Sequence, residues 1–144
     1  PLYGHDLTEK TTPVEAGLGW VVSKNNQSCF AADKLHTQKA EGTDRVRMSV
    51  KLLEKGIARE GTEILSDDGT VVGTLTSGGF SPTCDYGIGQ GYIDAGYATP
   101  GTAIKLRVRK REIAAEVSSL FLVNPRTKSP KTIKKQEKDE KQYG

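Results

Sequence analysis

From Asp44 onward, apolar and polar residues alternate, and this alternation limits the possible folds more than any other feature of the chain. The apolar positions of the first alternating run are Val46, Met48, Val50 and Leu52. Successive side chains of a strand point to opposite faces, so a period of two predicts a half-buried β-strand. The Asp68-Gly69 pair between Ile64–Ser66 and Val71–Leu75 then predicts a β-hairpin.

Further strands are predicted along the rest of this region. They lie at Ile88–Ile93, Ala103–Val108 and Ile113–Val117, with a tight polar loop at Thr76–Pro82 and a turn at Arg109–Arg111. About six short strands punctuated by Gly and Pro, with no long helix between them, are typical of a small antiparallel barrel or jelly-roll sandwich. The predicted fold class is therefore mainly β, with this domain at residues 43–124.

The first 42 residues follow a different pattern, which predicts connecting and helical structure. Thr12–Glu15 has the form of a capping box, with Pro at the first helical position. Trp20–Val22 is predicted as a short strand. A helix is predicted over Phe30–Ala40, with Phe30 and Leu35 facing inward. A short α+β region therefore precedes the β domain.

Charge is distributed unevenly in this chain of 144 residues, whose formal net charge is +3. Residues 126–144 hold seven basic and three acidic residues, whereas residues 1–125 have a net charge of −1. We expect residues 125–144 to be a disordered basic tail, because they cannot bury enough apolar area to offset chain entropy. This distribution does not predict nucleic-acid binding, which requires a structured basic surface with aromatic residues. No apolar run reaches the roughly 18 residues of a spanning helix, so no membrane association is predicted.

Few residues suggest catalysis or metal binding. Cys29 and Cys84 stand far apart without a Cys-x-x-Cys pattern, and the chain has two histidines, His5 and His36. Two reduced thiols and no metal site are therefore predicted. Gly87–Gly91 superficially resembles a phosphate-binding loop, but strand-like sequence follows it, so its glycines are predicted to allow close backbone approach.

A set of motifs occurs in a fixed order along the chain. It comprises Leu2-Tyr3-Gly4-His5-Asp6, Thr11-Thr12-Pro13-Val14-Glu15, Phe30 with Leu35, Gly56–Gly61, Gly73–Pro82 and Gly91-Tyr92-Ile93. From residue 1 to about residue 123, this series resembles the glycine cleavage system T-protein (aminomethyltransferase) family. Ala32 departs from the pattern, because the family usually has Gly there.

The resemblance implies a three-domain cloverleaf with an all-β C-terminal domain. Residues 1–42 would be the end of the middle domain, and residues 43–124 the C-terminal barrel. The chain starts at Pro1 and not at Met, and we expect it to be a C-terminal fragment that is inactive alone. The implied reaction passes a one-carbon unit from the aminomethyl-lipoyl arm of the H-protein to tetrahydrofolate and releases ammonia.

The resemblance also indicates where the site residues lie. The family's catalytic Asp, and the Glu and Arg that hold folate, would lie upstream of Pro1, so no catalytic residue is expected in this chain. Tyr3 is expected to contact folate through its ring, or else only to pack at the domain junction. Trp20 is expected to pack in the core or at the junction, and His5 is given no role. Two tyrosines that often follow the family's last strand are absent near Lys128.

Two alternatives remain open. One is a folate-dependent demethylase, or the C-terminal part of a dimethylglycine- or sarcosine-oxidising enzyme. The other is a non-enzymatic β-barrel binding module that uses the basic tail. Members of the resembled family would lie in the mitochondrial matrix in eukaryotes and in the cytoplasm in bacteria.

Overall fold

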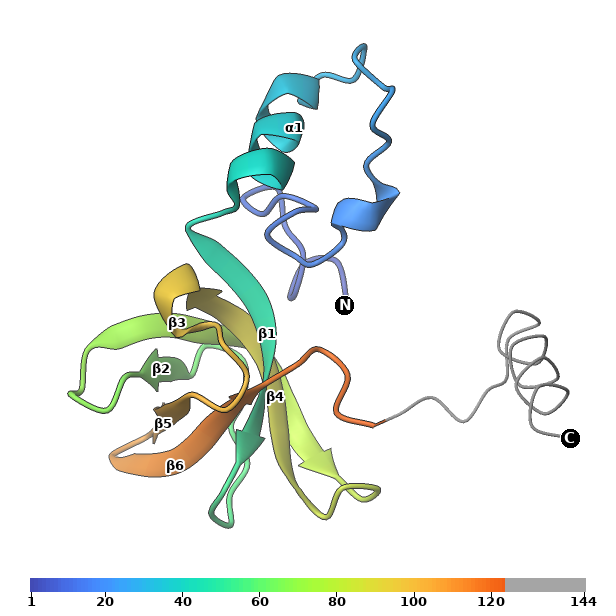
Figure 1. The fold of residues 1–144 in the computed structure, drawn as a ribbon. Coiled ribbons are helices and arrows are strands. Elements are labelled where there is room, and N and C mark those ends of the chain that lie inside the picture. The colour runs from blue at the N-terminus through green and yellow to red at the C-terminus, as the bar shows by residue number, and fades with distance from the viewer. Residues whose placement is uncertain (124–144) are drawn as a thin grey trace, which may run out of the picture.

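Six strands form a closed antiparallel barrel in the computed structural model, which describes residues 1–123 (Figure 1). They are β1 (Arg45–Leu52), β2 (Glu63–Leu65), β3 (Val71–Ser81), β4 (Tyr86–Asp94), β5 (Ala103–Val108) and β6 (Arg111–Ser118). Their order around the barrel is β1-β4-β3-β2-β5-β6, and β6 pairs with β1 to close it. The mainly β fold class predicted from the sequence is confirmed. The predicted tail, residues 125–144, lies outside the described residues.

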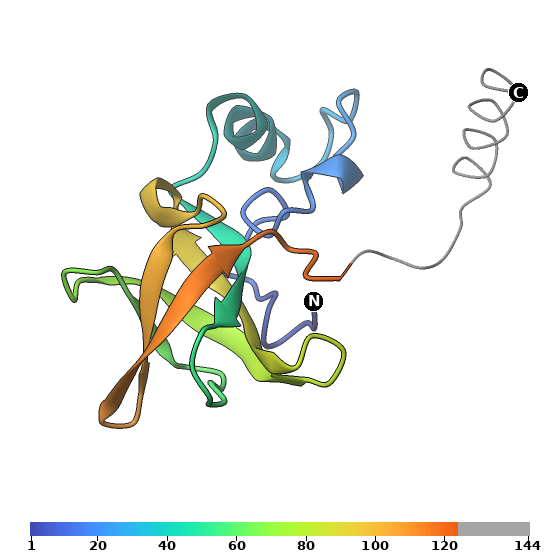
Figure 2. The ribbon, with the colours of Figure 1, turned by 60° about the horizontal axis from the view of Figure 1, so that its bottom comes forward.

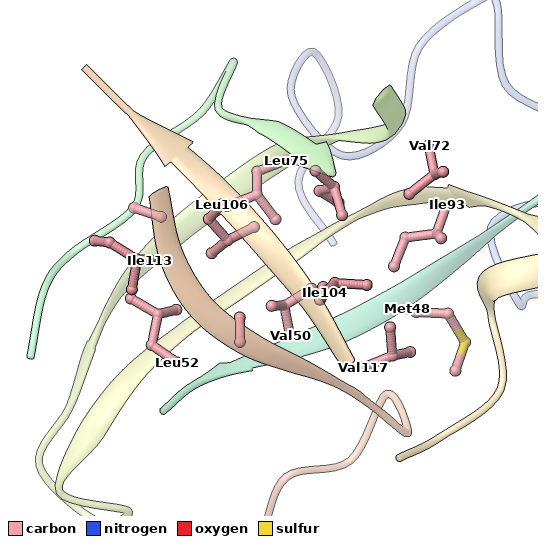
Figure 3. Close-up of a cluster of buried hydrophobic side chains, with 13 residues drawn as sticks. Met48, Val50, Leu52, Val72, Leu75, Ile93, Ile104, Leu106, Ile113 and Val117 are labelled. Carbon is pink, nitrogen blue, oxygen red and sulfur yellow. The ribbon is translucent and has the colours of Figure 1, made fainter. Parts of the chain in front are cut away.

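One apolar cluster fills the barrel (Figure 3). Its members are Met48, Val50, Leu52, Ala58, Ile64, Val72, Leu75, Ile93, Ile104, Leu106, Ile113, Ala115 and Val117. The alternation predicted for β1 is confirmed, since its even-numbered residues from Met48 onward point into this cluster. Each fully buried large side chain stabilises the fold by about 1.5–3 kcal/mol relative to exposure, so this interior is the main source of stability.

Strand β4 turns glycines toward the barrel interior at positions 87, 89 and 91. A Cβ at Gly91 would lie 2.3 Å from the carbonyl oxygen of Thr74, and one at Gly87 would lie 2.6 Å from that of Gly56. Both distances are shorter than any real contact, so only glycine fits. The predicted role of Gly87–Gly91 in close backbone approach is confirmed.

Strand β3 is longer than its sequence pattern predicts. The segment Thr76–Pro82 was expected to be a loop, but all of it except the proline continues the strand. Small residues make this possible, because Gly78 pairs directly with Gly89 of β4 and the two chains can approach closely. A register shift between Leu75 and Ser77 interrupts the period of two that would have identified the strand.

The first 42 residues contain one α-helix, α1 (Ala32–Glu41), which lies beyond the start of β1 (Figure 1). The predicted helix at Phe30–Ala40 is therefore confirmed to within two residues, and Leu35 is buried. The prediction that Phe30 faces inward was wrong, since this side chain is fully exposed. Phe30 precedes the helix, so helical periodicity does not fix its direction. No helix in residues 1–123 has the length and apolar character needed to cross a bilayer.

Two other predictions for this region were wrong. Trp20–Val22 is not a strand, because it lies largely within a one-turn 3₁₀ helix, η1 (Gly19–Val21). Trp20 is 81% exposed, so it does not pack in the core, and its packing at a domain junction stays a prediction. Thr12 does accept a hydrogen bond from the Glu15 amide at 3.2 Å, as in a capping box. The chain then turns at Gly17, whose φ is +72°, so no α-helix follows. A second 3₁₀ turn, η2 (Ala95–Tyr97), follows β4.

Candidate functional site

The outer face of β1, β4 and β3 is polar, and residues 1–22, here called the N-terminal segment, contact it between Asp6 and Ala16 (Figure 2). The outward side chains of this face are Arg45, Arg47, Ser49, Thr74, Ser77, Gln90 and Tyr92. A half-buried β1 was predicted, but Arg47 is 4% exposed and Ser49 is fully buried. Both faces of β1 are therefore covered. A covered polar face requires a partner for each of its donors and acceptors.

Asp6 is the central contact between the N-terminal segment and the barrel. It is 5% exposed, and its carboxylate accepts hydrogen bonds from Thr76 Oγ1 at 2.5 Å, Ser77 Oγ at 2.9 Å and the Leu2 amide at 2.9 Å. Burial alone would raise its pKa, but these hydrogen bonds together outweigh burial, and the pKa of Asp6 lies below its ordinary value. Asp6 is therefore ionised near neutral pH and holds the Leu2–Leu7 loop on β3.

A second set of contacts uses the two arginines of β1. Arg47 donates from Nε to the Ala16 carbonyl oxygen at 2.8 Å and from Nη1 to Gln90 Oε1 at 2.8 Å. Arg45 forms an ion pair with Glu15, with 3.0 Å between Nε and Oε2. Arg47 is thus a buried cation held by neutral acceptors, which fixes the turn around Ala16 against the barrel.

Tyr92 links the two sets of contacts. Its hydroxyl donates to the Asp6 carbonyl oxygen at 2.8 Å, and the Arg45 guanidinium lies 5.0 Å from its ring centroid. Burial raises the pKa of the Tyr92 phenol, so the hydroxyl remains a donor at neutral pH. We call the contacts of Asp6, Arg45, Arg47 and Tyr92 the polar junction.

His5 stands between two hollows that flank the polar junction. The first hollow lies between the Leu2–Asp6 loop and Arg59–Glu60, and the second between Thr8–Thr11 and Tyr92. His5 Nδ1 lies 2.8 Å from Glu60 Oε2, and both side chains are about half exposed. His5 is therefore accessible from both hollows, although no sequence pattern assigns it a role.

The structure places the remaining predicted residues as follows. Tyr3 lies on the Leu2–Leu7 loop with 70% of its surface exposed, and it lines neither hollow. Cys29 and Cys84 are free thiols. In residues 1–123, no group of three or more His, Cys, Asp or Glu side chains is placed to bind a metal ion. The polar junction itself was missed, because its partners come from segments 30 to 86 residues apart.

The polar junction can orient the Leu2–Leu7 loop, but the Asp6 carboxylate at its centre already accepts hydrogen bonds from protein donors. Three donors occupy the Asp6 carboxylate, and the low pKa keeps a proton off it. A general acid or base needs a free position within hydrogen-bond reach of a substrate. The polar junction is therefore suited to presenting the exposed Leu2–His5 loop to a ligand or to another part of a protein.

Comparison with known proteins agrees with this geometry. Residues 45–124 match the model of the glycine cleavage T-protein C-terminal barrel domain. An aminomethyltransferase of Halothermothrix orenii is 44% identical over 119 residues, which cover 83% of this chain and 33% of the relative. One of Bacteroides thetaiotaomicron is 41% identical over 117 residues, covering 81% of this chain and 32% of the relative.

A solved structure shows the same arrangement of strands. The glycine cleavage system aminomethyltransferase T from Bartonella henselae superposes with a TM-score of 0.77 at 32% identity. The match covers 83% of this chain and 34% of that chain. The chain thus spans about a third of the length of the relatives it matches.

Proposed function

The chain belongs to the glycine cleavage T-protein family, and from this we propose that it supplies the C-terminal part of an aminomethyltransferase. The observation that carries the proposal is the joint match of barrel and preceding residues to aminomethyltransferases over more than four-fifths of the chain. The proposed reaction moves a one-carbon unit from the aminomethyl-lipoyl arm of the H-protein to tetrahydrofolate, with release of ammonia.

The residues present fit one wall of a tetrahydrofolate site. Tetrahydrofolate supplies the nitrogen that accepts the one-carbon unit. The exposed ring of Tyr3 and the exposed Leu2 side chain offer apolar surface for a flat ring system. Asp6 does not face such a ligand, because three protein donors occupy it. We therefore propose that the reacting acid comes from the part of the relatives that this chain does not span.

In this proposal the polar junction is a positioning device. Asp6 fixes the loop that carries Tyr3, and Arg47 fixes the following turn at Ala16. Holding groups at a defined distance from the reacting atoms is a large part of catalysis when the reactants carry the covalent chemistry. The lipoylated H-protein is the proposed partner, and the bacterial cytoplasm is the proposed compartment because the relatives above are bacterial.

A chimera tests the proposal. This chain would replace the matching C-terminal third of the Halothermothrix orenii aminomethyltransferase. We expect the chimera to release ammonia from aminomethyl-lipoyl H-protein in the presence of tetrahydrofolate, within about tenfold of the parent, since one barrel should substitute for another. The chain alone should show no turnover. A folded, monodisperse chimera without activity would contradict the proposal, and so would turnover by the chain alone.

The role of Tyr3 is tested in the same chimera. Tyr3→Ala should weaken tetrahydrofolate binding by about three- to tenfold, the range of a lost aromatic contact. Tyr3→Phe keeps the ring and should bind as the parent chimera does. Equal binding by all three proteins would assign Tyr3 to packing alone. Isothermal titration calorimetry gives the three dissociation constants.

A further inference from the structure

A cluster of positive side chains surrounds one end of the barrel. The five are Lys55, Arg59, Arg109, Lys110 and Arg111, here called the cationic end. They come from the β1–β2 connection and from the β5–β6 hairpin, which Figure 1 shows at the end of the barrel away from α1. All five are exposed and line a single hollow.

This concentration does not follow from the overall charge. Residues 1–123 contain fourteen lysines and arginines against fifteen aspartates and glutamates. More than a third of the cationic side chains therefore meet at one hollow. Like charges placed this closely repel one another, so the cluster raises the local affinity for anions.

Three acidic residues lie in the same two segments: Glu60 and Glu112 have other partners, and Glu54 is exposed and lines a neighbouring hollow. Glu60 lies 2.8 Å from His5 on the N-terminal segment, and Glu112 lies 3.9 Å from Lys105. Within residues 1–123, no carboxylate lies within 4.0 Å of any of the five cationic groups. The five cationic groups thus form no ion pair with the described part of the chain.

The floor of the hollow is aliphatic. Ile57, Val108 and Ile113 line it, and Ile57 is 44% exposed. The residues that line it, all in the described part of the chain, include no aromatic ring and no carboxylate. Single-stranded nucleic acid is bound by basic grooves that also offer aromatic rings for base stacking. An aliphatic floor is instead suited to an apolar side chain.

We infer that the cationic end docks an acidic peptide segment of a partner protein, with one aliphatic side chain of that segment in the hollow. The carboxylates of the segment would lie against the five cationic groups, and its aliphatic side chain against Ile57. Charge complementarity of this kind sets orientation and association rate, while the desolvated apolar contact adds affinity. The hollow of the cationic end shares only Arg59 with the first hollow beside the polar junction, and the inference does not depend on the proposed transferase function.

The test uses the full chain and a labelled peptide in which one leucine stands between two runs of glutamate. Fluorescence anisotropy measures binding to the parent protein and to Lys55→Glu/Lys110→Glu. The charge reversal should weaken binding by about tenfold or more, since it replaces two attractions by repulsions. Lys24→Glu/Lys34→Glu is the matched control. It makes the same change in net charge at exposed positions elsewhere and should alter affinity by less than about twofold.

Two further measurements separate the contributions of charge and of apolar burial to peptide binding. Replacing the peptide's leucine by alanine should weaken binding by about fivefold, because apolar burial in the hollow is lost. The milder Lys55→Gln/Lys110→Gln should lie between the parent and the charge reversal, and it serves if the reversal fails to fold. Equal losses in the reversal and its control would overturn the inference, as would indifference to the leucine. Tighter binding of a single-stranded oligonucleotide through Lys55 and Lys110 would also overturn it.

Discussion

The barrel and the N-terminal segment are stabilised by opposite means. The barrel buries a continuous apolar cluster, and Ile64, Leu106 and Val117 are fully buried in it. The N-terminal segment instead leaves Leu2, Tyr3 and Trp20 exposed, and binds the barrel through the polar junction. The difference indicates that apolar burial supplies most of the stability of the barrel. The attachment of the segment depends instead on a few hydrogen bonds whose partners must be correctly placed.

Leu106→Ala should produce the largest effect and should act on the whole molecule. Removing this fully buried side chain leaves a cavity, and such changes cost about 2–5 kcal/mol of unfolding free energy. Urea denaturation followed by circular dichroism measures the loss. Leu53→Ala, at a position 56% exposed, is the control and should cost less than about 0.5 kcal/mol. Equal costs at the two positions would contradict the account of the barrel.

Gly91→Ala tests the close approach of β4 and β3. The added Cβ would meet the Thr74 carbonyl oxygen at 2.3 Å, so backbone must move, and we expect a loss of about 1–3 kcal/mol. Gly96→Ala adds the same methyl group where nothing lies within 4 Å and should be nearly neutral. Thermal unfolding of the two variants gives the difference. A neutral Gly91→Ala would show that the strands can separate without cost.

Asp6→Asn should separate the two regions. The change removes the charge that accepts three hydrogen bonds, and we expect a loss of about 1–2 kcal/mol, confined to the N-terminal segment. Limited proteolysis should cut residues 7–22 sooner, while amide exchange within the barrel strands stays unchanged. Asp67→Asn, at an exposed turn position, is the control. Faster exchange throughout the barrel would mean that the two regions form one cooperative unit.

Lowering the pH should reversibly weaken the contact between Asp6 and β3. The folded pKa of Asp6 is lowered from the ordinary value of 3.8, so its contribution to stability is fully present above that value. This contribution is lost as the pH falls through the lower folded pKa. The stability difference between the parent protein and Asp6→Asn should therefore shrink as the pH falls below 3.8. A difference that stays constant to pH 2 would exclude the Asp6 charge as its cause.

Arg109→Asn should give the smallest effect, and in the stabilising direction. Arg109 has a φ of +58° in the β5–β6 hairpin, a left-handed conformation that costs most residues about 1 kcal/mol and Asn less. We expect a gain of about 0.5 kcal/mol in unfolding free energy. Arg111→Asn makes the same charge change in extended backbone and should not stabilise the protein. Equal changes in both variants would point to charge and not to backbone conformation.

The sequence predicts the barrel well where its signals are local. The alternation in β1 and the strand at Ala103–Val108 are both confirmed, because a period of two depends only on neighbouring residues. The same reasoning missed the second half of β3, where a bulge and paired glycines break the period. Strand pairing across the bulge becomes visible only in three dimensions.

The polar junction could not be predicted for a different reason. Asp6 and Thr76 are 70 residues apart, and neither lies in a pattern that indicates burial. For Trp20 and Phe30 the sequence predicted burial that the structure does not show. Large aromatic residues are usually buried, but both of these side chains are exposed here. An exposed aromatic residue has meaning only relative to what covers it, and the sequence of one chain does not contain that information.

The burial of Arg47 beneath the N-terminal segment determines what happens when that segment leaves the barrel. If the segment lifts away, the guanidinium exchanges the Ala16 carbonyl for water, and the apolar cluster inside the barrel stays dry. Release of the segment would therefore break the hydrogen bonds of the polar junction and leave the packing of the barrel interior in place.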